Sequence, residues 1–472
     1  MNSFFRNHKI PLLLVLTACL FYASFSYDLV RSDFIKLITL YAGLFLLSWK
    51  LLQLEKNNFW FLAGAAILFR LIFIAALPNL SQDFYRFIWD GRMIIEGWNP
   101  YLHLPENLIK EGTAPVAQAS KLFEGMGELS GSNYTNYPPL NQLIFAIAGL
   151  FAGKSILGSV IVMRIIIIGV DLGTLYFGKK LLENLNLPVN RIFWYILNPF
   201  IIIELTGNLH FEGVMLFFLI WSLYLLHKKK WILSAVVFAA SVSLKLVPLL
   251  FLPLLFRYFT VENSQNRLNL WKLCLYYLIV VVLVILSFLP FLSSDLISNF
   301  SASIGLWFQK FEFNASIYYL IRWVGFQVKG YNIIETAGKA LPVVVILILG
   351  GLAIFRKNNS SQRLITTMLL GVSVYFFLST TVHPWYIATP LLLSVFTRYR
   401  FAVIWSFMVI LSYFAYSDAV SRENLWLVAL EYIVVIGMFT YEIQMRRRKI
   451  LKYEVRSRKF FTLILCFVGL QV

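Results

Sequence analysis

Residues able to do proton-transfer chemistry gather in one short stretch, SQDFYRFIWDGRMIIEGWNPYLHLP, which runs from Ser81 to Pro105. Asp83, Arg86 and Asp90 recur there at helical spacing, so one face of a short helix would carry two carboxylates with an arginine between them. A carboxylate held in this way can accept the proton of a substrate hydroxyl. The same pattern also fits a simple ion network on an amphipathic helix, and both interpretations stay open on this stretch alone.

The ends of this predicted helix are marked by residue type. Ser81 can cap its N-terminus and Gly97 can end it. The helix is too short and too polar to cross a bilayer, so we expect it at the membrane interface. Its dipole and the neighbouring Arg86 are both expected to lower the pKa of the Asp83 carboxyl, which would make that group a weak base.

Other unusual polar residues occur later, next to apolar segments. In Asn133–Leu140, NYTNYPPL, two prolines suit the first turn of an apolar helix. Lys245 and Pro248 interrupt the apolar run 231–256, where we predict two half-spans with Lys245 near their outer end. Lys245 could equally snorkel to the interface without binding a ligand. The other candidates, which could also be satisfied polar turns or helix caps, are Asn208, His210, Glu212, Arg322, His383 and Trp385.

The elements that must position these residues are membrane-spanning helices. Of the 472 residues, 59% are hydrophobic, against roughly 45–50% in a soluble protein. Apolar runs long enough to cross about 30 Å of hydrocarbon recur along the whole chain. The predicted fold is an all-α polytopic membrane protein with about 13 transmembrane helices. The predicted spans are 10–27, 34–52, 59–78, 156–178, 191–206, 211–227, 231–256, 271–292, 339–356, 364–381, 384–397, 401–417 and 425–443.

The basic residues predict the orientation of these spans. The net charge of +18 comes largely from short loops such as Lys228–Lys230 and Arg446–Lys449, which is the positive-inside pattern and not a nucleic-acid-binding face. With these loops inside, the region 79–155 faces outward, provided that the apolar run 138–153 does not span. We therefore predict that 138–153 is an interfacial or half-buried helix and that the candidate residues converge on the outer face.

The order of these motifs resembles the GT-C superfamily of membrane glycosyltransferases, and most closely the polyprenol-phosphate-mannose-dependent mannosyltransferases. That group includes the enzyme that adds the first mannose of glycosylphosphatidylinositol, and bacterial relatives. The resemblance implies a GT-C-like helix bundle whose outer loop carries interfacial helices and a catalytic aspartate. It covers residues 60–400 and rests on YRFIWDGRMIIEGWNPY, the YPPL segment, Asn198-Pro199 with Asn208-Leu209-His210, Leu244–Pro253, and His383-Pro384-Trp385-Tyr386.

Asp83 is the residue that matches the catalytic aspartate of this family. Many relatives have two carboxylates where this chain has Ser81-Gln82-Asp83, and their loop follows the first span, whereas here it follows the third. We therefore interpret 1–58 as an added N-terminal transmembrane hairpin. The division continues with 59–400 as the catalytic core with outer loop 79–155, and 401–472 as C-terminal helices with a basic cytoplasmic tail.

The resemblance also implies the substrates and the reaction. The donor is a sugar, mannose by resemblance alone, on a polyprenyl phosphate, and the acceptor is a hydroxyl of a glycan or glycolipid at the outer face. In a bacterial inner membrane this face is the periplasm. One displacement would invert the anomeric centre. The predicted phosphate ligands are Lys245, His383 and Arg322, as cations. The predicted substrate contacts are Arg86, Asp90, Tyr137, Asn208, His210, Glu212 and Trp385.

No cofactor or metal is expected, because a lipid phosphate brings no nucleotide diphosphate that needs neutralising. Cys19, Cys274 and Cys466 lie in apolar segments without metal-ligand spacing. Two other functional classes stay open. One is a lipid or glycan transporter or flippase, although the sequence shows no convincing inverted repeat. The other is a glycan polymerase or ligase with a lipid-diphosphate donor, which the second outer region 293–338 would suit.

Overall fold

The computed structural model describes residues 8–260, 270–417 and 422–467, of which 307–309 and 447–467 are described by their backbone alone. Within these ranges the regular elements are helices, with one isolated β-bridge between Phe313 and Thr381. The all-α class predicted from the sequence is confirmed. The basic side chains beyond Arg446, Cys466 and the segment 460–472 fall outside the described side chains.

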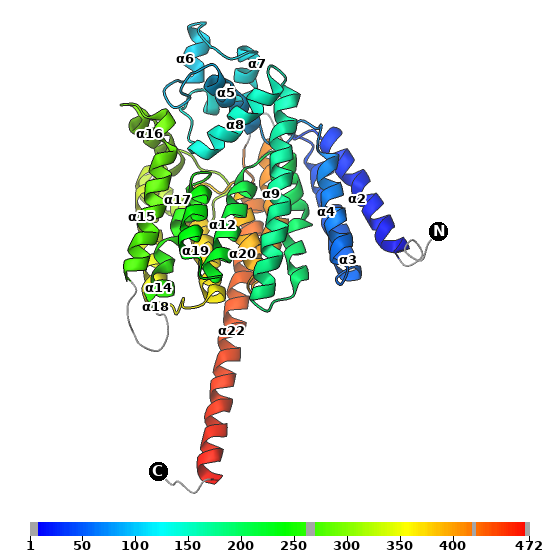
Figure 1. The fold of residues 1–472 in the computed structure, drawn as a ribbon, viewed down its shortest axis with the longest axis vertical. Coiled ribbons are helices and arrows are strands. Elements are labelled where there is room, and N and C mark those ends of the chain that lie inside the picture. Colours follow the sequence, from blue (N-terminus) through cyan, green and yellow to red (C-terminus); the bar gives the residue numbers. More distant parts are fainter. Residues whose placement is uncertain (1–7, 261–269, 418–421, 468–472) are drawn as a thin grey trace.

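The helices form a bundle that is covered at one end (Figure 1). The chain begins with α2 (Lys9–Tyr27), α3 (Phe34–Leu54) and α4 (Phe59–Ile72). Four helices then form the cover, which we call the cap: α5 (Asp83–Ile95), α6 (Pro105–Lys110), α7 (Ala119–Gly131) and α8 (Pro139–Ala152). From the cap, α9 (Ile156–Asn184) returns along the bundle. Its 29 residues correspond to about 43 Å of helix.

The rest of the chain completes the bundle and ends at the pole opposite the cap, where α22 extends away from the other helices (Figure 1). The elements that follow α9 are η1 (Val189–Ile192), α10 (Phe193–Ile196), α11 (Pro199–Ile201), the π-helical η2 (Ile202–Gly207), α12 (Glu212–His227), α13 (Trp231–Val242), η3 (Val247–Phe251), η4 (Pro253–Leu255), α14 (Phe256–Thr260), α15 (Leu270–Ser287), η5 (Leu289–Phe291), α16 (Leu296–Gln309), α17 (Ile317–Lys329), α18 (Ile334–Phe355), α19 (Ser361–Leu378), η6 (Pro384–Ile387), α20 (Ala388–Val395), α21 (Phe401–Met408), η7 (Val409–Tyr416) and α22 (Leu425–Phe467).

Seven helices of the described chain are long and apolar enough to cross a bilayer, or eight if the bent pair Pro199–Gly207 and Glu212–His227 counts as one span. A polytopic membrane protein is therefore confirmed. Several of the 13 predicted spans are shorter apolar helices instead, among them Phe59–Ile72, Pro384–Val395 and Phe401–Tyr416. The helix in 138–153, α8, has 14 residues or about 21 Å, so it is too short to cross the bilayer, as predicted.

The predicted interruption in 231–256 is also present. Helix α13 ends at Val242, and short 3₁₀ segments resume at Val247, so Lys245 lies in a break of the helix. The main chain of this break is bonded to the start of α8. The Leu140 N–H donates to the Ser243 carbonyl at 3.1 Å, and the Asn141 side chain donates to the Leu244 carbonyl at 2.6 Å. The cap and the break are thereby fixed to one another.

The cap holds together through close backbone contact between α5 and α8. A Cβ atom at Gly91 would lie 2.1 Å from the Phe145 carbonyl oxygen, so only glycine allows this approach. The Phe87 and Phe145 rings stack at a centroid distance of 4.6 Å in the same interface. This packing fixes the direction in which the start of α5 faces the bundle.

Two charged residues inside the bundle, Arg164 and Asp171, lie on the same helix, α9, but find their partners on other segments. Asp171 accepts from the Arg70 Nε at 2.6 Å, and both side chains are buried. Arg164 donates to four backbone carbonyls, those of Ile74, Ala76, Thr206 and Gly207. The two residues are two turns apart on α9, so each finds its partner on another segment.

Replacing Arg70 with methionine should lower the free energy of unfolding by about 3–5 kcal/mol, because it leaves Asp171 buried without its partner. The double variant Arg70→Met/Asp171→Leu should recover most of this loss, since neither charge then remains. The thermal unfolding midpoint in detergent measures both changes. An unchanged midpoint in the single variant would show that the pair does not stabilise the bundle.

Candidate functional site

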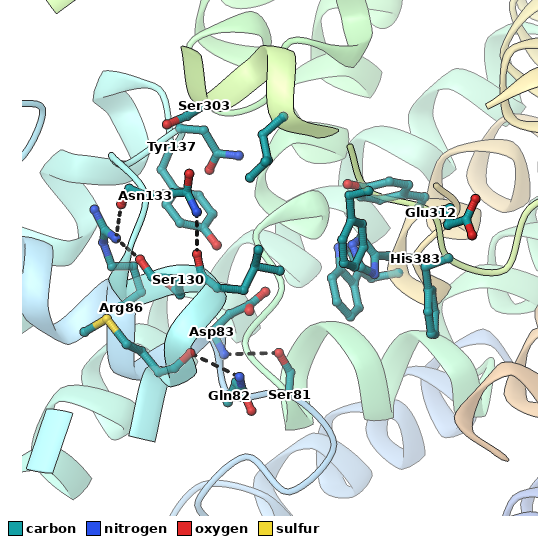
Figure 2. A pocket seen from close by; sticks show the side chains of 18 of the residues that line it. Ser81, Gln82, Asp83, Arg86, Ser130, Asn133, Tyr137, Ser303, Glu312 and His383 are labelled. Carbon is teal, nitrogen blue, oxygen red and sulfur yellow. Dashed lines mark hydrogen bonds between the residues drawn. The ribbon is translucent and has the colours of Figure 1, made fainter. Parts of the chain in front are cut away.

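A cavity of about 820 Å³ lies between the cap and the bundle. Figure 2 shows side chains of the cap on one side of it and His383 and Glu312 on the other. Its wall is built from segments that are far apart in the sequence. The charged or polar side chains that line it include Arg31, Asp83, Arg86, Asn133, Tyr137, Lys245, Glu312, Arg322, His383, Trp385, Arg422 and Glu423.

Asp83 is the first residue of α5 and lies half-buried in the cavity wall. The segment before it is fixed by Asn208, whose Oδ1 accepts the Leu80 N–H at 3.0 Å. The Ser81 hydroxyl accepts the Asp83 N–H at 3.3 Å, so Ser81 is bonded to the helix start although Gln82 holds the cap position. At the other end, Gly97 has a φ of +79° and ends the helix as predicted.

The electrostatics of Asp83 differ from the sequence expectation. Burial raises the pKa of the Asp83 carboxyl, with a further contribution from the Glu212 carboxylate, while Lys245 and Arg31 oppose the rise. The expected partner, Arg86, is engaged elsewhere: its Nε lies 2.8 Å from Asp90 Oδ1, and both groups are buried. The prediction of a lowered pKa was therefore wrong. Burial removes water from the half-buried Asp83 carboxylate and raises its pKa by more than the start of α5 lowers it, and Arg86 pairs with Asp90 instead.

Arg86 and Asp90 support the wall of the cavity. Arg86 Nη1 donates to the carbonyls of Ser130 and Asn133, at 2.5 and 2.9 Å, and Asp90 Oδ2 accepts from Gln142 at 3.0 Å. These bonds tie α5 to the segment that leads into α8. Arg86 reaches the cavity, whereas Asp90 is fully buried and is not part of its lining.

Lys245 reaches the cavity from the break after α13. Its Nζ lies 3.0 Å from Glu212 Oε1 and 5.3 Å from the centre of the Tyr137 ring. Tyr137 belongs to the YPPL segment, and its ring packs edge-on against Phe87 of α5 at 5.0 Å. The structure therefore brings Asp83, Tyr137 and Lys245, which are predicted from three separate motifs, to one cavity.

His383 forms part of the opposite wall and packs between aromatic rings. Its ring stacks on Trp385 at 4.6 Å and on Phe313 at 5.4 Å. Burial, together with the positive charges of Lys245 and Arg31, lowers the pKa of His383 to about 3. The imidazole is therefore neutral, and the cation expected from the sequence is replaced by a neutral hydrogen-bonding group.

Three predicted substrate contacts lie behind the wall. His210 stacks on Trp385 with a centroid distance of 3.7 Å, Glu212 holds Lys245, and Asn208 holds the backbone before α5. All three are buried, and none belongs to the lining. They position residues that do line the cavity. The sequence therefore predicted that these three residues lie near the site, but not that their side chains are buried behind its wall.

The region 293–338 contributes a second group of charged residues. Arg322 is paired with Glu312 and lies 4.3 Å from the Tyr319 ring. Nearby, Glu423 accepts the Asn314 backbone N–H at 2.6 Å and the Tyr319 hydroxyl. Arg322 lines the cavity as predicted, but its charge is already compensated. Among the described residues no group of three histidines, cysteines or carboxylates is placed to hold a metal ion.

Sequence reasoning missed Arg31, Glu312 and Glu423. Glu312 and Glu423 belong to no recognisable motif and reach the cavity only through the folding of distant segments. Arg31 carried a usable signal: it lies between two spans in a short connection that the predicted topology places outside. A basic residue there is an exception to the positive-inside pattern.

Comparison with known proteins places this chain in a family. A relative from Corynebacterium glutamicum, alpha-(1->6)-mannopyranosyltransferase A, is 27% identical over 182 residues, which is 38% of this chain and 35% of the relative. The chain thus matches about a third of the length of this curated relative. The family described as alpha-(1->6)-mannopyranosyltransferase, N-terminal domain, matches residues 21–260. That range contains Arg31, Asp83, Tyr137 and Lys245, and it covers more than half of the chain. The chain therefore belongs to the alpha-(1->6)-mannopyranosyltransferase family.

Proposed function

We propose that the protein is a membrane mannosyltransferase that moves mannose from a polyprenyl-phosphate donor to a hydroxyl of a glycan or glycolipid. The observation that carries this proposal is the shared cavity, in which the Asp83 carboxylate and the Lys245 ammonium face one space large enough for a sugar and its acceptor. The α-(1→6) linkage of the product is proposed from the name of the family.

The chemistry is a single displacement at the anomeric carbon. The acceptor oxygen forms a bond to that carbon while the bond to the phosphate oxygen breaks, and the polyprenyl phosphate leaves with the electron pair. Asp83 takes the proton of the attacking hydroxyl. Lys245 stabilises the charge that develops on the phosphate, and His383 donates to it as a neutral N–H. A β-linked donor would then give an α-linked product.

The raised pKa of Asp83 makes this group a better base than an ordinary carboxylate. It also predicts how the rate of transfer depends on pH. Only the ionised form accepts a proton, so transfer is expected to fall as pH falls through the raised pKa. The midpoint of this acid limb should lie above about 3.9, the ordinary value for aspartate. A pH profile of kcat/KM measures it. A limb at or below the ordinary value would remove Asp83 as the base.

The cavity is proposed to open on the outer face of the membrane. It lies at the cap end, whereas α12 starts at the buried Glu212 beside Lys245 and leads over about 24 Å to the basic loop Lys228–Lys230. The positive-inside pattern would place that loop in the cytoplasm and the cavity in the periplasm of a bacterial inner membrane. Labelling of single introduced cysteines by an impermeant reagent in intact cells tests this orientation.

The direct test is transfer from radiolabelled polyprenyl-phosphate mannose by membranes that contain the protein, with and without glycolipid extracts as acceptor. We expect label in a glycan product only when the protein is present. Polyprenyl-diphosphate sugars serve as the comparison donor. Transfer from the diphosphate alone would favour a polymerase or ligase, and movement of intact donor across the bilayer without transfer would favour a flippase.

A further inference from the structure

The connection between α2 and α3 sends one side chain into the candidate site. Arg31 lies in this connection and lines the cavity with Asp83 and Lys245. Its guanidinium carbon lies 3.2 Å from the centre of the Tyr416 ring, and Tyr416 lines the cavity as well. The first two helices were predicted to form an added hairpin, so a residue from them in this wall was not expected.

The connection is held in place from two sides. On one side, the Asn79 side chain donates to the carbonyls of Phe25 and Leu29, at 2.7 and 3.2 Å. Asn79 lies just before the start of α5, so these bonds join the hairpin to the segment that carries Asp83. On the other side, the Phe34 ring at the start of α3 packs edge-on against Phe414 at 5.1 Å. The position of Arg31 is therefore fixed relative to the cavity.

The charge of Arg31 is not compensated in the way that the charges of three other cavity cations, Lys245, Arg86 and Arg322, are. Lys245 pairs with Glu212, Arg86 with Asp90 and Arg322 with Glu312. Arg31 forms no ion pair with a carboxylate in the part of the chain that the structure describes, and its Nε is buried without an acceptor there. A buried donor without an acceptor is costly unless a ligand supplies one. An anionic ligand would supply both this acceptor and a counter-charge for the guanidinium.

Arg31 also lies on the wall that carries His383. The Tyr416 ring under its guanidinium packs against Phe313 at 5.9 Å, and Phe313 in turn stacks on His383 at 5.4 Å. The positive charge of Arg31 acts on both sides of the cavity, since it lowers the pKa of His383 and opposes the rise in the pKa of Asp83. Lys245 acts on the same two groups, so a phosphate bound between Asp83 and His383 would meet the positive charge of both Lys245 and Arg31.

We propose that Arg31 binds the phosphate of the polyprenyl-phosphate donor, which makes the N-terminal hairpin part of the active site. This inference rests on the proposed function. A guanidinium offers two parallel N–H donors to a phosphate, and it keeps its charge at any working pH. Because Glu212 already balances part of the charge of Lys245, Arg31 adds to Lys245 the further positive charge that an anionic ligand needs.

The test compares Arg31→Gln, Arg31→Lys and the native chain in two assays. The first is the KM for polyprenyl-phosphate mannose. The second is the inhibition constant of polyprenyl phosphate without sugar. For Arg31→Gln we expect both constants to rise together, roughly 10- to 150-fold, from the loss of hydrogen bonds to a charged group. Arg31→Lys should bind more weakly than native but better than Arg31→Gln, because it keeps the charge and loses the paired donors.

The control is Lys36→Gln, which removes a cation of the same hairpin whose partner, Asp28, is exposed. Its constants should match the native ones. Unchanged constants in folded Arg31→Gln would overturn the inference. If Arg31→Gln does not fold, Arg31→Lys decides, and native-like inhibition by polyprenyl phosphate in that variant would have the same meaning. Absence of transfer by the native chain would instead contradict the proposed function, so the two failures are distinguishable.

Discussion

Replacing Asp83 with asparagine is expected to lower mannosyl transfer by about 10²–10⁴-fold, the range by which a positioned general base accelerates a reaction. The amide has nearly the same shape as the carboxylate but cannot take the proton of the acceptor hydroxyl. The donor KM should change much less than kcat, because the role proposed for Asp83 is toward the acceptor hydroxyl and not toward the phosphate. Initial rates at saturating donor, in membranes with equal amounts of folded protein, measure the loss.

A matched control for this variant is Glu124→Gln, which removes an exposed carboxylate from α7 of the same cap. It should keep the native rate. Full activity in Asp83→Asn would show that the base is another group, even though the protein still transferred mannose. A loss of both folded protein and activity would call for Asp83→Glu, which retains the carboxylate and is expected to keep measurable transfer.

Replacing Lys245 with glutamine is expected to lower transfer by about 10²–10³-fold, comparable to the loss of one donor that stabilises charge in a transition state. It should also lower the unfolding midpoint, because Glu212 is buried and loses its partner. These two effects can be separated. In the double variant Lys245→Gln/Glu212→Gln the buried carboxylate of Glu212 is removed together with its partner, so stability should return while transfer stays low.

The double variant also differs from the single variant in the expected pH dependence of transfer. Lys245 lowers the pKa of Asp83 and Glu212 raises it, so their joint removal should leave the acid limb of the pH profile nearly in place. The single variant Lys245→Gln should move this limb to higher pH. A double variant with native rates would mean that Lys245 serves only as a counter-ion for Glu212 and that the phosphate is bound by other residues.

The sequence predicted those features of the site that depend on local signals. Gly97 marked the end of α5 because a positive φ favours glycine there. Pro248 marked the break around Lys245, since proline removes a helix hydrogen bond. The run 138–153 was predicted not to span from the positions of the basic loops, and the 14 residues of α8 agree with that prediction. All-helical membrane architecture followed from the length and composition of the apolar runs.

Other features depend on contacts between distant segments and could not be read from the chain. The pKa of Asp83 is set by burial against segments far along the sequence. The neutral state of His383 has the same kind of cause. Arg322 was taken for a free cation, yet it pairs with Glu312 across the turn before α17. His210 and Glu212 stood in a motif that suggested a cavity, but the segment that carries them is buried behind it.

The cavity wall draws on residues from Arg31 near the start of the chain to Glu423 near its end. A ribosome delivers these residues in order, so the wall is closed only after the segments from α2 to the start of α22 have been inserted into the membrane. Until then Lys245 and Arg31 lack part of the protein that surrounds them, and the cavity is incomplete. Nascent chains that stop before α22 should therefore lack activity and be targets of membrane quality control.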